Sequence, residues 1–572
     1  MSKTTRPLSS ARPLWLSDAR LELALFAVFA LLVLGLGLGL RDPWPSDEPR
    51  FALVARAMVE HGQWLFPHRG SELYADKPPL FMWLQASAYL LTGNWRVAFA
   101  LPSLLAGLSA LALVYDLARR LWNHRSALLA AMTLLVTIHF TYQMRNAQID
   151  PLLVGWITLA NYGLLRHLLL GPAWRWFAVG CLAAGLGVIT KGVGVLALLM
   201  LVPWALARRR GWRALPALRG GWCWWLGPVA FLLPVLAWLL PMLAAAHADG
   251  DPQHAAYVQD ILFGQTVHRY AQPSGHLHSP LYFPGIIVVD WLPLSLLLPW
   301  AIPAWWRRLR RGDGRLALLL GWVVLVLVFF SLSPGKRDVY ILPTLPMVAL
   351  ALAPLLPGLL RRRGVRLALA TLTGTLALTL ALAASVATLR HPTWAANIEQ
   401  GLDPRIWHLL FVIGAAGIVI VAITRLRRAA LGWLLFASVL WGTYGLWGYP
   451  MLNGERSARD VMDQARAIAG PGQAIGLVAW KEQNLLMASG PVTEFGFLQP
   501  WPQQFAAATR WMRADPAQRW AFAPQTAMGA CVERKRARHV GHANRREWWM
   551  FQADAVVPDC VPGTTADATD TD

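Results

Sequence analysis

Charged residues are scarce in this chain of 572 residues. They make up 15% of it, against 56% hydrophobic residues and a mean hydropathy of +0.41. This composition excludes a water-soluble protein of ordinary type and indicates a membrane protein. Only four cysteines are present, which excludes a disulfide-based scaffold and a cysteine-rich metal site. The sequence also lacks a P-loop and a glycine-rich dinucleotide motif between a strand and a helix, so no nucleotide site is indicated.

Acidic residues are also few, 31 against 52 Lys and Arg, which leaves a net charge of +21. On a soluble chain such an excess would indicate nucleic-acid binding. Here the excess of basic residues lies in the segments on one side of the predicted membrane spans. With a cytoplasmic N-terminus, the predicted inner loops hold 26 Lys and Arg but only two acidic residues. The excess is therefore an orientation signal under the positive-inside rule, and no nucleic-acid partner is expected. About 13 spans are predicted, at roughly 21–40, 97–118, 126–144, 151–165, 176–190, 193–207, 222–246, 282–306, 316–333, 340–360, 367–389, 406–424 and 429–448.

The hydropathy pattern divides the chain in two. Residues 1–448 are predicted to form a polytopic α-helical membrane domain with outer loops at 41–96 and 247–281. From 449 to 572 polar and apolar residues alternate, with a helix-like and then a strand-like segment, which predicts a small α/β domain in the periplasm. Cys531 and Cys560 both fall in it, where an oxidising compartment would allow a disulfide, whereas Cys181 and Cys223 lie at spans and are expected to stay reduced.

Ionisable residues beside membrane spans mark functional sites more often than chance, and the first outer loop holds the densest set. These are Asp42, Asp47, Glu48 and Arg50, followed by Asp76 and Lys77 before a Pro-Pro pair. Two interpretations stay open. Carboxylates before an amphipathic stretch at 50–61 can simply begin a helix. Alternatively, the two clusters come together on one surface at the membrane edge.

Three more outer segments carry candidates. Asp150 precedes a proline at the start of a span, and helix initiation is an equally open interpretation. Positive charge on the outer side runs against the orientation signal and therefore favours an anion, for which a lipid-linked phosphate is the natural choice. The basic residues concerned are Lys336 and Arg337, in a short turn with Asp338 and Tyr340. The loop before 282 brings cationic or metal-ligating groups to the same side with His268, Arg269, His276 and His278, for whose histidines a surface position is an open alternative.

Five segments resemble the bacterial phospholipid-carrier-dependent glycosyltransferases, among them the lipid A aminoarabinose transferases and relatives of the protein O-mannosyltransferases. They are DEPRFALVARAMVEHGQWLFP, ELYADKPPLFMWL, ITKGVGVLALL, HRYAQPSGHLHSPLYFP and KRDVYILPTLPMVAL. The resemblance implies a GT-C fold in the bacterial inner membrane with a periplasmic active site. It also implies a sugar donor on a polyprenyl phosphate, transfer with inversion, and an acceptor on lipid A or lipopolysaccharide, another envelope glycan or a protein hydroxyl.

The resemblance also assigns roles to residues. It makes Asp47 the general base or acceptor-orienting carboxylate and Asp150 a second acidic residue at the cavity, with Glu48 beside them as a further catalytic candidate. Arg50 would order the loop, and Lys191 of the TKG element would be structural. The residues expected to bind the carrier phosphate or surround it are Lys77, Arg269, Lys336, Arg337 and Tyr340.

Two positions depart from the aminoarabinose transferases, which usually have Glu and His where this chain has Asp76 and Thr266. A metal pair of Asp76 and His268, and any divalent cation, therefore stay open, and the sequence requires no cofactor. The alternative function is a membrane transporter or flippase for a lipid-linked anion. Transporters often show inverted repeats and charges at the bilayer midplane. Here the charges gather in one set of outer loops and no repeat is evident.

Overall fold

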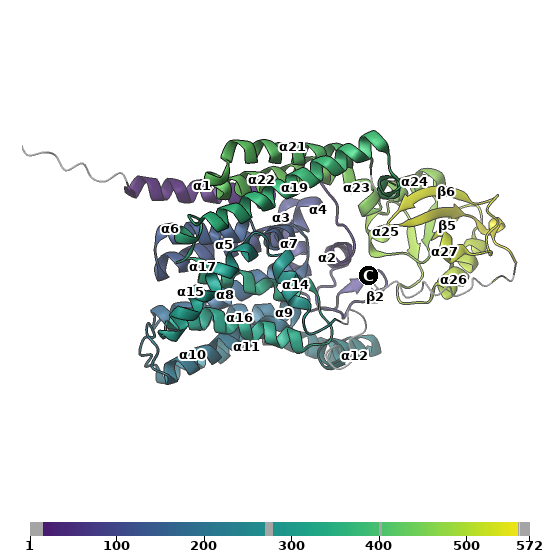
Figure 1. The fold of residues 1–572 in the computed structure, drawn as a ribbon. Coiled ribbons are helices and arrows are strands. Elements are labelled where there is room, and N and C mark those ends of the chain that lie inside the picture. Colours follow the sequence, from purple (N-terminus) through teal and green to yellow (C-terminus); the bar gives the residue numbers. More distant parts are fainter. Residues whose placement is uncertain (1–14, 269–277, 400–402, 559, 561–572) are drawn as a thin grey trace, which may run out of the picture.

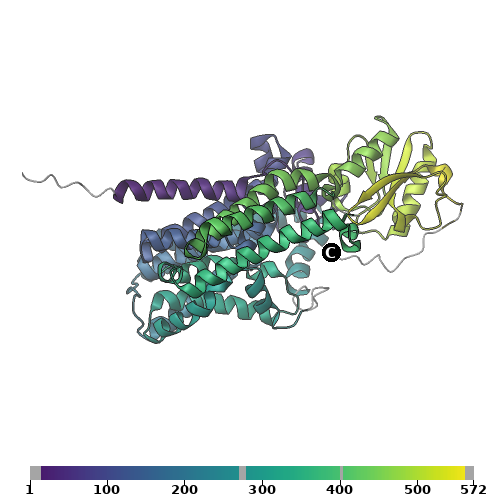
Figure 2. The same cartoon turned by 45° about the horizontal axis from the view of Figure 1, so that its top comes forward.

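The computed structural model describes residues 15–268, 278–399, 403–558 and 560. A bundle of long helices forms most of the molecule, and a C-terminal part that contains a sheet projects from one end of it (Figure 1). The helices α2 (Glu48–His61) and α12 (Pro252–Gln259) lie at that same end. The helix α1 (Trp15–Gly35) extends toward the opposite end (Figures 1 and 2).

The predicted polytopic helical architecture is confirmed. Seven described helical segments are long and apolar enough to cross a membrane, or nine if two bent pairs each count as one span, so the expected number of 13 is not confirmed. The elements of the bundle after α1 are α5 (Leu101–Leu121), α6 (His124–Leu135), α7 (Ile138–Met144), α8 (Ile149–Leu170), α9 (Trp174–Lys191), η1 (Val193–Met200), α10 (Leu201–Arg209), η2 (Gly221–Trp225), α11 (Leu226–Asp249), α14 (Tyr282–Val289), η4 (Leu294–Leu297), α15 (Leu298–Arg310), α16 (Gly314–Leu332), η5 (Asp338–Thr344), α17 (Leu345–Leu352), α18 (Leu356–Leu359), α19 (Arg363–Arg390), α20 (Thr393–Glu399), α21 (Ile406–Thr424), η6 (Leu426–Arg428), α22 (Ala429–Thr443) and η7 (Tyr444–Gly448).

Two predicted spans, 126–144 and 282–306, are not single straight helices. The first bends by 69° between α6 and α7, and the second by 95° between α14 and η4. Ile138 N–H donates to the carbonyl of Leu292 (2.8 Å), and His139 N–H donates to that of Asp290 (3.0 Å). A bent helix frees backbone groups that lipid cannot satisfy. The two bends therefore supply hydrogen-bond partners to each other, which hydropathy alone cannot reveal.

The first outer loop is a packed structure. It comprises α2, the hairpin of β1 (His68–Arg69) and β2 (Glu72–Leu73), and the helices α3 (Leu80–Thr92) and α4 (Trp95–Ala98). Phe51, Val54 and Met58 recur at helical spacing on α2 and are buried against Phe81 of α3, which meets Phe51 edge to face at 5.5 Å. The amphipathic helix predicted at 50–61 is therefore confirmed, with a start two residues earlier.

The C-terminal part contains a five-stranded sheet in the order β4-β3-β5-β7-β6. β4, β3 and β5 are parallel to one another. β7 is antiparallel to both of its neighbours, β5 and β6. The elements are α23 (Tyr449–Ser457), α24 (Arg459–Ala469), β3 (Ala474–Leu477), α25 (Glu482–Met487), β4 (Val492–Glu494), α26 (Trp501–Ala514), β5 (Arg519–Pro524), α27 (Gln525–Met528), β6 (Arg538–Ala543), β7 (Arg546–Phe551) and η8 (Ala553–Ala555). The expected helix–strand succession is present as α24 and β3.

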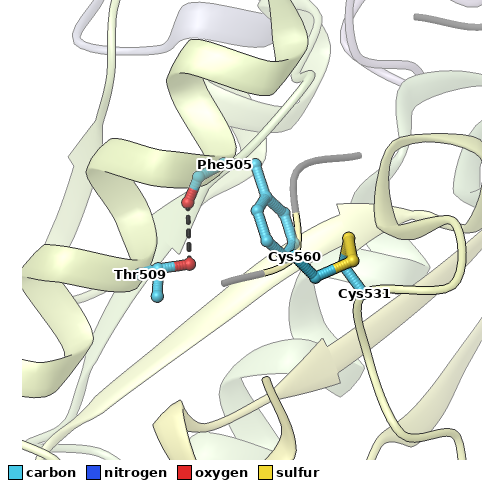
Figure 3. Close-up of a disulfide and its surroundings, with 4 residues drawn as sticks. All are labelled: Phe505, Thr509, Cys531 and Cys560. Atoms are coloured by element: carbon cyan, nitrogen blue, oxygen red, sulfur yellow. Dashed lines mark hydrogen bonds between the residues drawn. A yellow bond between two sulfur atoms is a disulfide. The ribbon is translucent and has the colours of Figure 1, made fainter. Parts of the chain in front are cut away.

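A disulfide joins Cys531 to Cys560, as the sequence allowed. Figure 3 shows the ring of Phe505 beside this bond. Phe505 belongs to α26, where its carbonyl accepts a hydrogen bond from Thr509 Oγ1 (2.9 Å). Cys181 and Cys223 are free. The disulfide therefore attaches the end of the described chain to the buried cluster between α26 and the sheet.

Candidate functional site

Asp47 and Arg337 meet where the first loop contacts the turn after α16. Asp47 Oδ2 lies 3.2 Å from Arg337 Nη2, and Asp47 Oδ1 lies 3.6 Å from Arg50 Nη1. Asp47 occupies the N-cap position of α2, yet its side chain makes no capping hydrogen bond. The side chain therefore pairs with two guanidinium groups, and the simple capping interpretation does not describe it.

Asp150 stands on the first turn of α8 and forms an ion pair with Lys191, the last residue of α9. Lys191 Nζ also lies 5.2 Å from the ring centroid of Tyr340, which packs against Phe330 of α16. Lys191, expected to be structural, is thus the direct partner of one candidate acid. The TKG element brings α8, α9 and η5 together.

The two candidate acids act on a single guanidinium. Burial of Arg337 disfavours its charge, but the carboxylates of Asp47 and then Asp150 outweigh this effect and raise its pKa. Arg337 therefore lies within electrostatic reach of both carboxylates. The predicted clusters of the first loop, of the start of α8 and of the turn at 333–340 come together at one end of the bundle.

Glu48 has different surroundings. It is buried, and its carboxylate pairs with the guanidinium of Arg41 and accepts the backbone N–H groups of Trp44 (2.8 Å) and Ala147 (2.7 Å). Four donors occupy the roughly four lone-pair positions of a carboxylate. This geometry favours a structural role for Glu48, which joins the first loop to the segment before α8. It provides no support for the catalytic role expected from the sequence.

Lys336 and Lys77, both candidates for phosphate binding, contact backbone carbonyls. Lys336 is 2% exposed and donates to the carbonyls of His278 (3.0 Å) and Ser333 (2.5 Å), so it ties the segment before α14 to the turn. Lys77 Nζ donates to the carbonyl of Asp76 (2.8 Å). The side chain of Asp76 lies 3.8 Å from Arg69 of β1.

The proposed metal pair stays untested. Asp76 is described, but only the backbone of His268 is, as the last residue of the π-helical segment η3 (Asp260–His268). Arg269 and His276 lie outside the described residues. His278 is described and stacks on Tyr282 with a centroid distance of 4.3 Å. Within the described part of the chain, no group of three or more His, Cys, Asp and Glu side chains could hold a metal ion.

Sequence reasoning named Asp42 without identifying a partner for it and missed Glu482, although both carboxylates build this end of the molecule. Asp42 is buried and paired with Arg96 of α4 (2.9 Å) and Arg459 of α24 (2.7 Å). Glu482 of α25 is paired with Arg50 (2.9 Å) and Arg69 (3.5 Å). The scarcity of acidic residues is the one sequence signal that singles out these carboxylates, and it does not identify their partners.

Parts of the chain are similar in sequence to known glycosyltransferases. Residues 76–238 match the family model described as dolichyl-phosphate-mannose-protein mannosyltransferase. The undecaprenyl phosphate-alpha-4-amino-4-deoxy-L-arabinose arabinosyl transferase of Pectobacterium carotovorum is 32% identical over 346 residues, which cover 59% of each chain. The second such enzyme of Sodalis glossinidius is 30% identical over 58% of each chain. The matched region spans less than two thirds of these relatives.

Solved structures show the same fold. The crystal structure of ArnT from Cupriavidus metallidurans bound to undecaprenyl phosphate superposes with a TM-score of 0.72 at 21% identity, covering 94% of this chain and 99% of that one. The oligosaccharyltransferase of Archaeoglobus fulgidus in the apo form gives a TM-score of 0.51 at 13% identity, covering 91% and 71%. The resemblance and the GT-C fold predicted from the sequence are therefore confirmed, and the chain is a multi-pass membrane protein.

Proposed function

We propose that the protein is an inverting glycosyltransferase that moves a sugar from a polyprenyl-phosphate carrier to an acceptor hydroxyl. The observation that carries this proposal is the ion pair between Asp47 and Arg337 at the start of η5. In the same element the ring of Tyr340 lies 5.2 Å from the ammonium of Lys191, which is the ion-pair partner of Asp150. A base and a cation beside each other are the two groups that a displacement at a sugar phosphate requires.

In the proposed reaction the acceptor oxygen attacks the anomeric carbon as the bond from that carbon to the carrier phosphate breaks. The bonding electrons leave on the phosphate oxygen, and the hydroxyl proton passes to Asp47. The departing phosphate is already an anion, so charge stabilisation matters more than protonation. Arg337 is suited to this task because its guanidinium offers several N–H donors in one plane. A phosphate that pairs with Arg337 would also free Asp47 to accept the proton.

We further propose that Asp150, held on the first turn of α8 by Lys191, is a second catalytic carboxylate of the site, and that Lys77, Arg269, Lys336 and Tyr340 surround the carrier phosphate. For Lys336 the contribution is indirect, because its ammonium is held by two carbonyls. Glu48 and Arg41 hold the loop on which Asp47 stands.

The donor that the relatives favour is undecaprenyl phosphate-linked 4-amino-4-deoxy-L-arabinose, a pentose, because the arabinosyl transferases matched above are named for that substrate. The acceptor proposed from the resemblance is lipid A. Asp76 and Thr266 are the two positions at which this chain departs from the aminoarabinose transferases, and both lie in predicted outer loops. A second acceptor is therefore an outcome that the experiment below includes.

We propose an inner-membrane location with a cytoplasmic N-terminus, and with the active site and residues 449–572 in the periplasm. The basic inner loops support this orientation. The disulfide in the C-terminal part is compatible with an oxidising compartment. The change of architecture after η7 supports a boundary near 448 between the membrane domain and a separate C-terminal domain.

The test is a reconstitution with defined substrates. Purified protein is incubated with undecaprenyl phosphate-linked aminoarabinose and lipid A, and the products are analysed by mass spectrometry. Transfer is expected to add the sugar to lipid A and release undecaprenyl phosphate. If lipid A is not modified, donor turnover with envelope glycans or periplasmic proteins as acceptors still supports glycosyl transfer. Movement of the intact lipid-linked sugar across proteoliposomes without any turnover would support a flippase and contradict the proposal.

A further inference from the structure

A buried carboxylate of the C-terminal part reaches into the first loop. Glu482 is the first residue of α25 and is 3% exposed. Its Oε1 atom accepts a hydrogen bond from Arg50 Nε at 2.9 Å and lies 3.5 Å from Arg69 Nη1. Both arginines belong to the first outer loop, on α2 and β1. The C-terminal part therefore supplies a charge to the segment that carries Asp47.

Arg50 lies between two carboxylates, and its contact with Glu482 is closer than its contact with Asp47. Its Nε contacts Glu482 at 2.9 Å, whereas its Nη1 lies 3.6 Å from Asp47 Oδ1, beyond hydrogen-bonding distance. Burial of Arg50 disfavours its charge, but Glu482, with a smaller contribution from Asp47, outweighs this effect and raises the pKa of Arg50. By distance Glu482 is thus the closer partner of Arg50, and the contact of Arg50 with Asp47 is the looser one.

This division of partners matters for a base. A carboxylate held closely by cations gives up basicity, because opposite charges favour its ionised form. Asp47 already pairs with Arg337 at 3.2 Å. Without the charge of Glu482, Arg50 would keep Asp47 as its ion-pair partner among the described residues. A second tight guanidinium on Asp47 would make it a poorer proton acceptor.

We propose that Glu482 is a positioning residue for sugar transfer, which holds Arg50 away from Asp47 and so keeps that carboxylate available to the acceptor hydroxyl. The inference rests on the proposed function and deepens it, because it makes the C-terminal part necessary for the chemistry at the bundle. Arg69 secures the same contact from the other side. It is buried, and its guanidinium lies 3.9 Å from the ring centroid of Phe497.

The chain offers a matched control at the same interface. Glu494 also joins the C-terminal part to the hairpin, but its Oε1 accepts the backbone N–H of Ser71 (2.8 Å). Within the described part of the chain it forms no hydrogen bond or ion pair with Arg50. Glu494→Gln therefore weakens the interface without changing the partners of Arg50. Its kcat is expected to stay at the wild-type value.

The experiment measures kcat and KM for undecaprenyl phosphate-linked aminoarabinose in purified full-length protein with Glu482→Gln, Arg50→Gln and both together. Glu482→Gln is expected to lower kcat by about tenfold or more while the donor KM changes by less than about threefold. The double variant is expected to be no slower than Arg50→Gln alone, because Glu482 acts only through Arg50. Glu482→Asp, which keeps the charge, is expected to recover part of the loss.

Three results would overturn the inference. The first is wild-type kcat in a folded Glu482→Gln protein. The second is a double variant whose losses multiply. The third is an equal loss in Glu494→Gln, which would mean that interface stability alone is at stake. Thermal unfolding of each variant checks that it folds, and Glu482→Asp replaces Glu482→Gln if the latter does not. If the wild-type protein turns over no donor, the proposed function fails. If it does and Glu482→Gln is unaffected, only this inference fails.

Discussion

Asp47 and Arg337 form an ion pair of 3.2 Å across 290 residues of sequence, and this pair joins the first outer loop to the turn after α16. Each partner is chemically the group that sugar transfer from a phosphate carrier would need. In this ion pair the charge of the carboxylate balances that of the guanidinium. Binding of a phosphate to Arg337 would then release the carboxylate for the acceptor.

Arg337 is the first residue to vary. Arg337→Gln is expected to lower kcat/KM for the lipid-linked donor by about 100-fold or more, because a charge that stabilises the leaving phosphate is lost. Arg337→Lys should restore only part of this, since an ammonium cannot replace a planar guanidinium. The control is Arg405→Gln, whose exposed ion pair with Asp403 lies outside the site. Equal activity in the Arg337→Gln protein and this control would exclude the assigned role.

Substitutions in the ion pair of Asp150 and Lys191 are expected to affect stability and activity differently. The side chains are only 9% and 15% exposed, so Lys191→Met leaves a carboxylate with little solvent and should destabilise the protein by about 3–5 kcal/mol. Adding Asp150→Asn removes that unpaired charge. The double variant should therefore regain stability, measured as the midpoint of thermal unfolding, but remain inactive. A double variant that recovers both would show that Asp150 is structural only.

Asp42 predicts an acid dependence of stability. Burial alone would raise its pKa, but hydrogen bonds from Arg459, Arg96 and Asn453 outweigh this and lower it from 3.8 to about 2. The unfolded chain binds the proton first as the pH falls. The stabilisation by Asp42 is therefore complete above pH 3.8 and is lost as the pH falls to about 2.

The measurement compares unfolding temperatures of the wild-type and Asp42→Asn proteins between neutral pH and about pH 2. The variant should be less stable at neutral pH, and the two curves should converge in acid. Asp515→Asn, a change at the end of α26 away from this cluster, serves as the control. A gap between wild type and Asp42→Asn that does not depend on pH would contradict the assignment.

The disulfide is expected to stabilise the C-terminal part. Cys531 and Cys560 are 29 residues apart, and a bridge over such a loop constrains the unfolded chain by about 3–4 kcal/mol. A protein with both residues changed to Ala should therefore unfold at a lower temperature, and a reducing agent should affect the wild-type protein but not this variant. Cys223→Ser, which removes a free thiol, is the control. Unchanged unfolding of the double Ala variant would show that the bond contributes nothing to stability.

The local pattern of polar and apolar residues was sufficient to predict the helices and strands in which that pattern is periodic. The spacing of Phe51, Val54 and Met58 predicted α2, and the succession of a helix and a strand after residue 454 predicted α24 and β3. Arg337 was also found as a candidate, because a positive charge on the predicted outer side departs from the positive-inside rule. The pairing of these residues was beyond reach, because ion pairs between distant segments leave no period in the sequence.

Two further features show the same limit. The bends at α6–α7 and α14–η4 depend on hydrogen bonds between Ile138 and Leu292 that hydropathy does not encode. Glu48 and Asp47 are neighbours with similar chemistry, yet one is enclosed by four donors and the other faces two arginines. Only tertiary structure distinguishes the carboxylate that holds the loop from the one available for catalysis.

The most direct measurement is the rate of aminoarabinose transfer to lipid A by purified Asp47→Asn protein. Its control is Asp116→Asn, which changes another arginine-paired carboxylate on α5, outside the candidate site. We expect Asp47→Asn to insert and fold like the wild type but to lose at least about 100-fold in kcat, the usual contribution of a general base. We expect Asp116→Asn to keep the wild-type kcat. Near-normal transfer by folded Asp47→Asn would contradict the assignment of this residue as the base and the mechanism built on it.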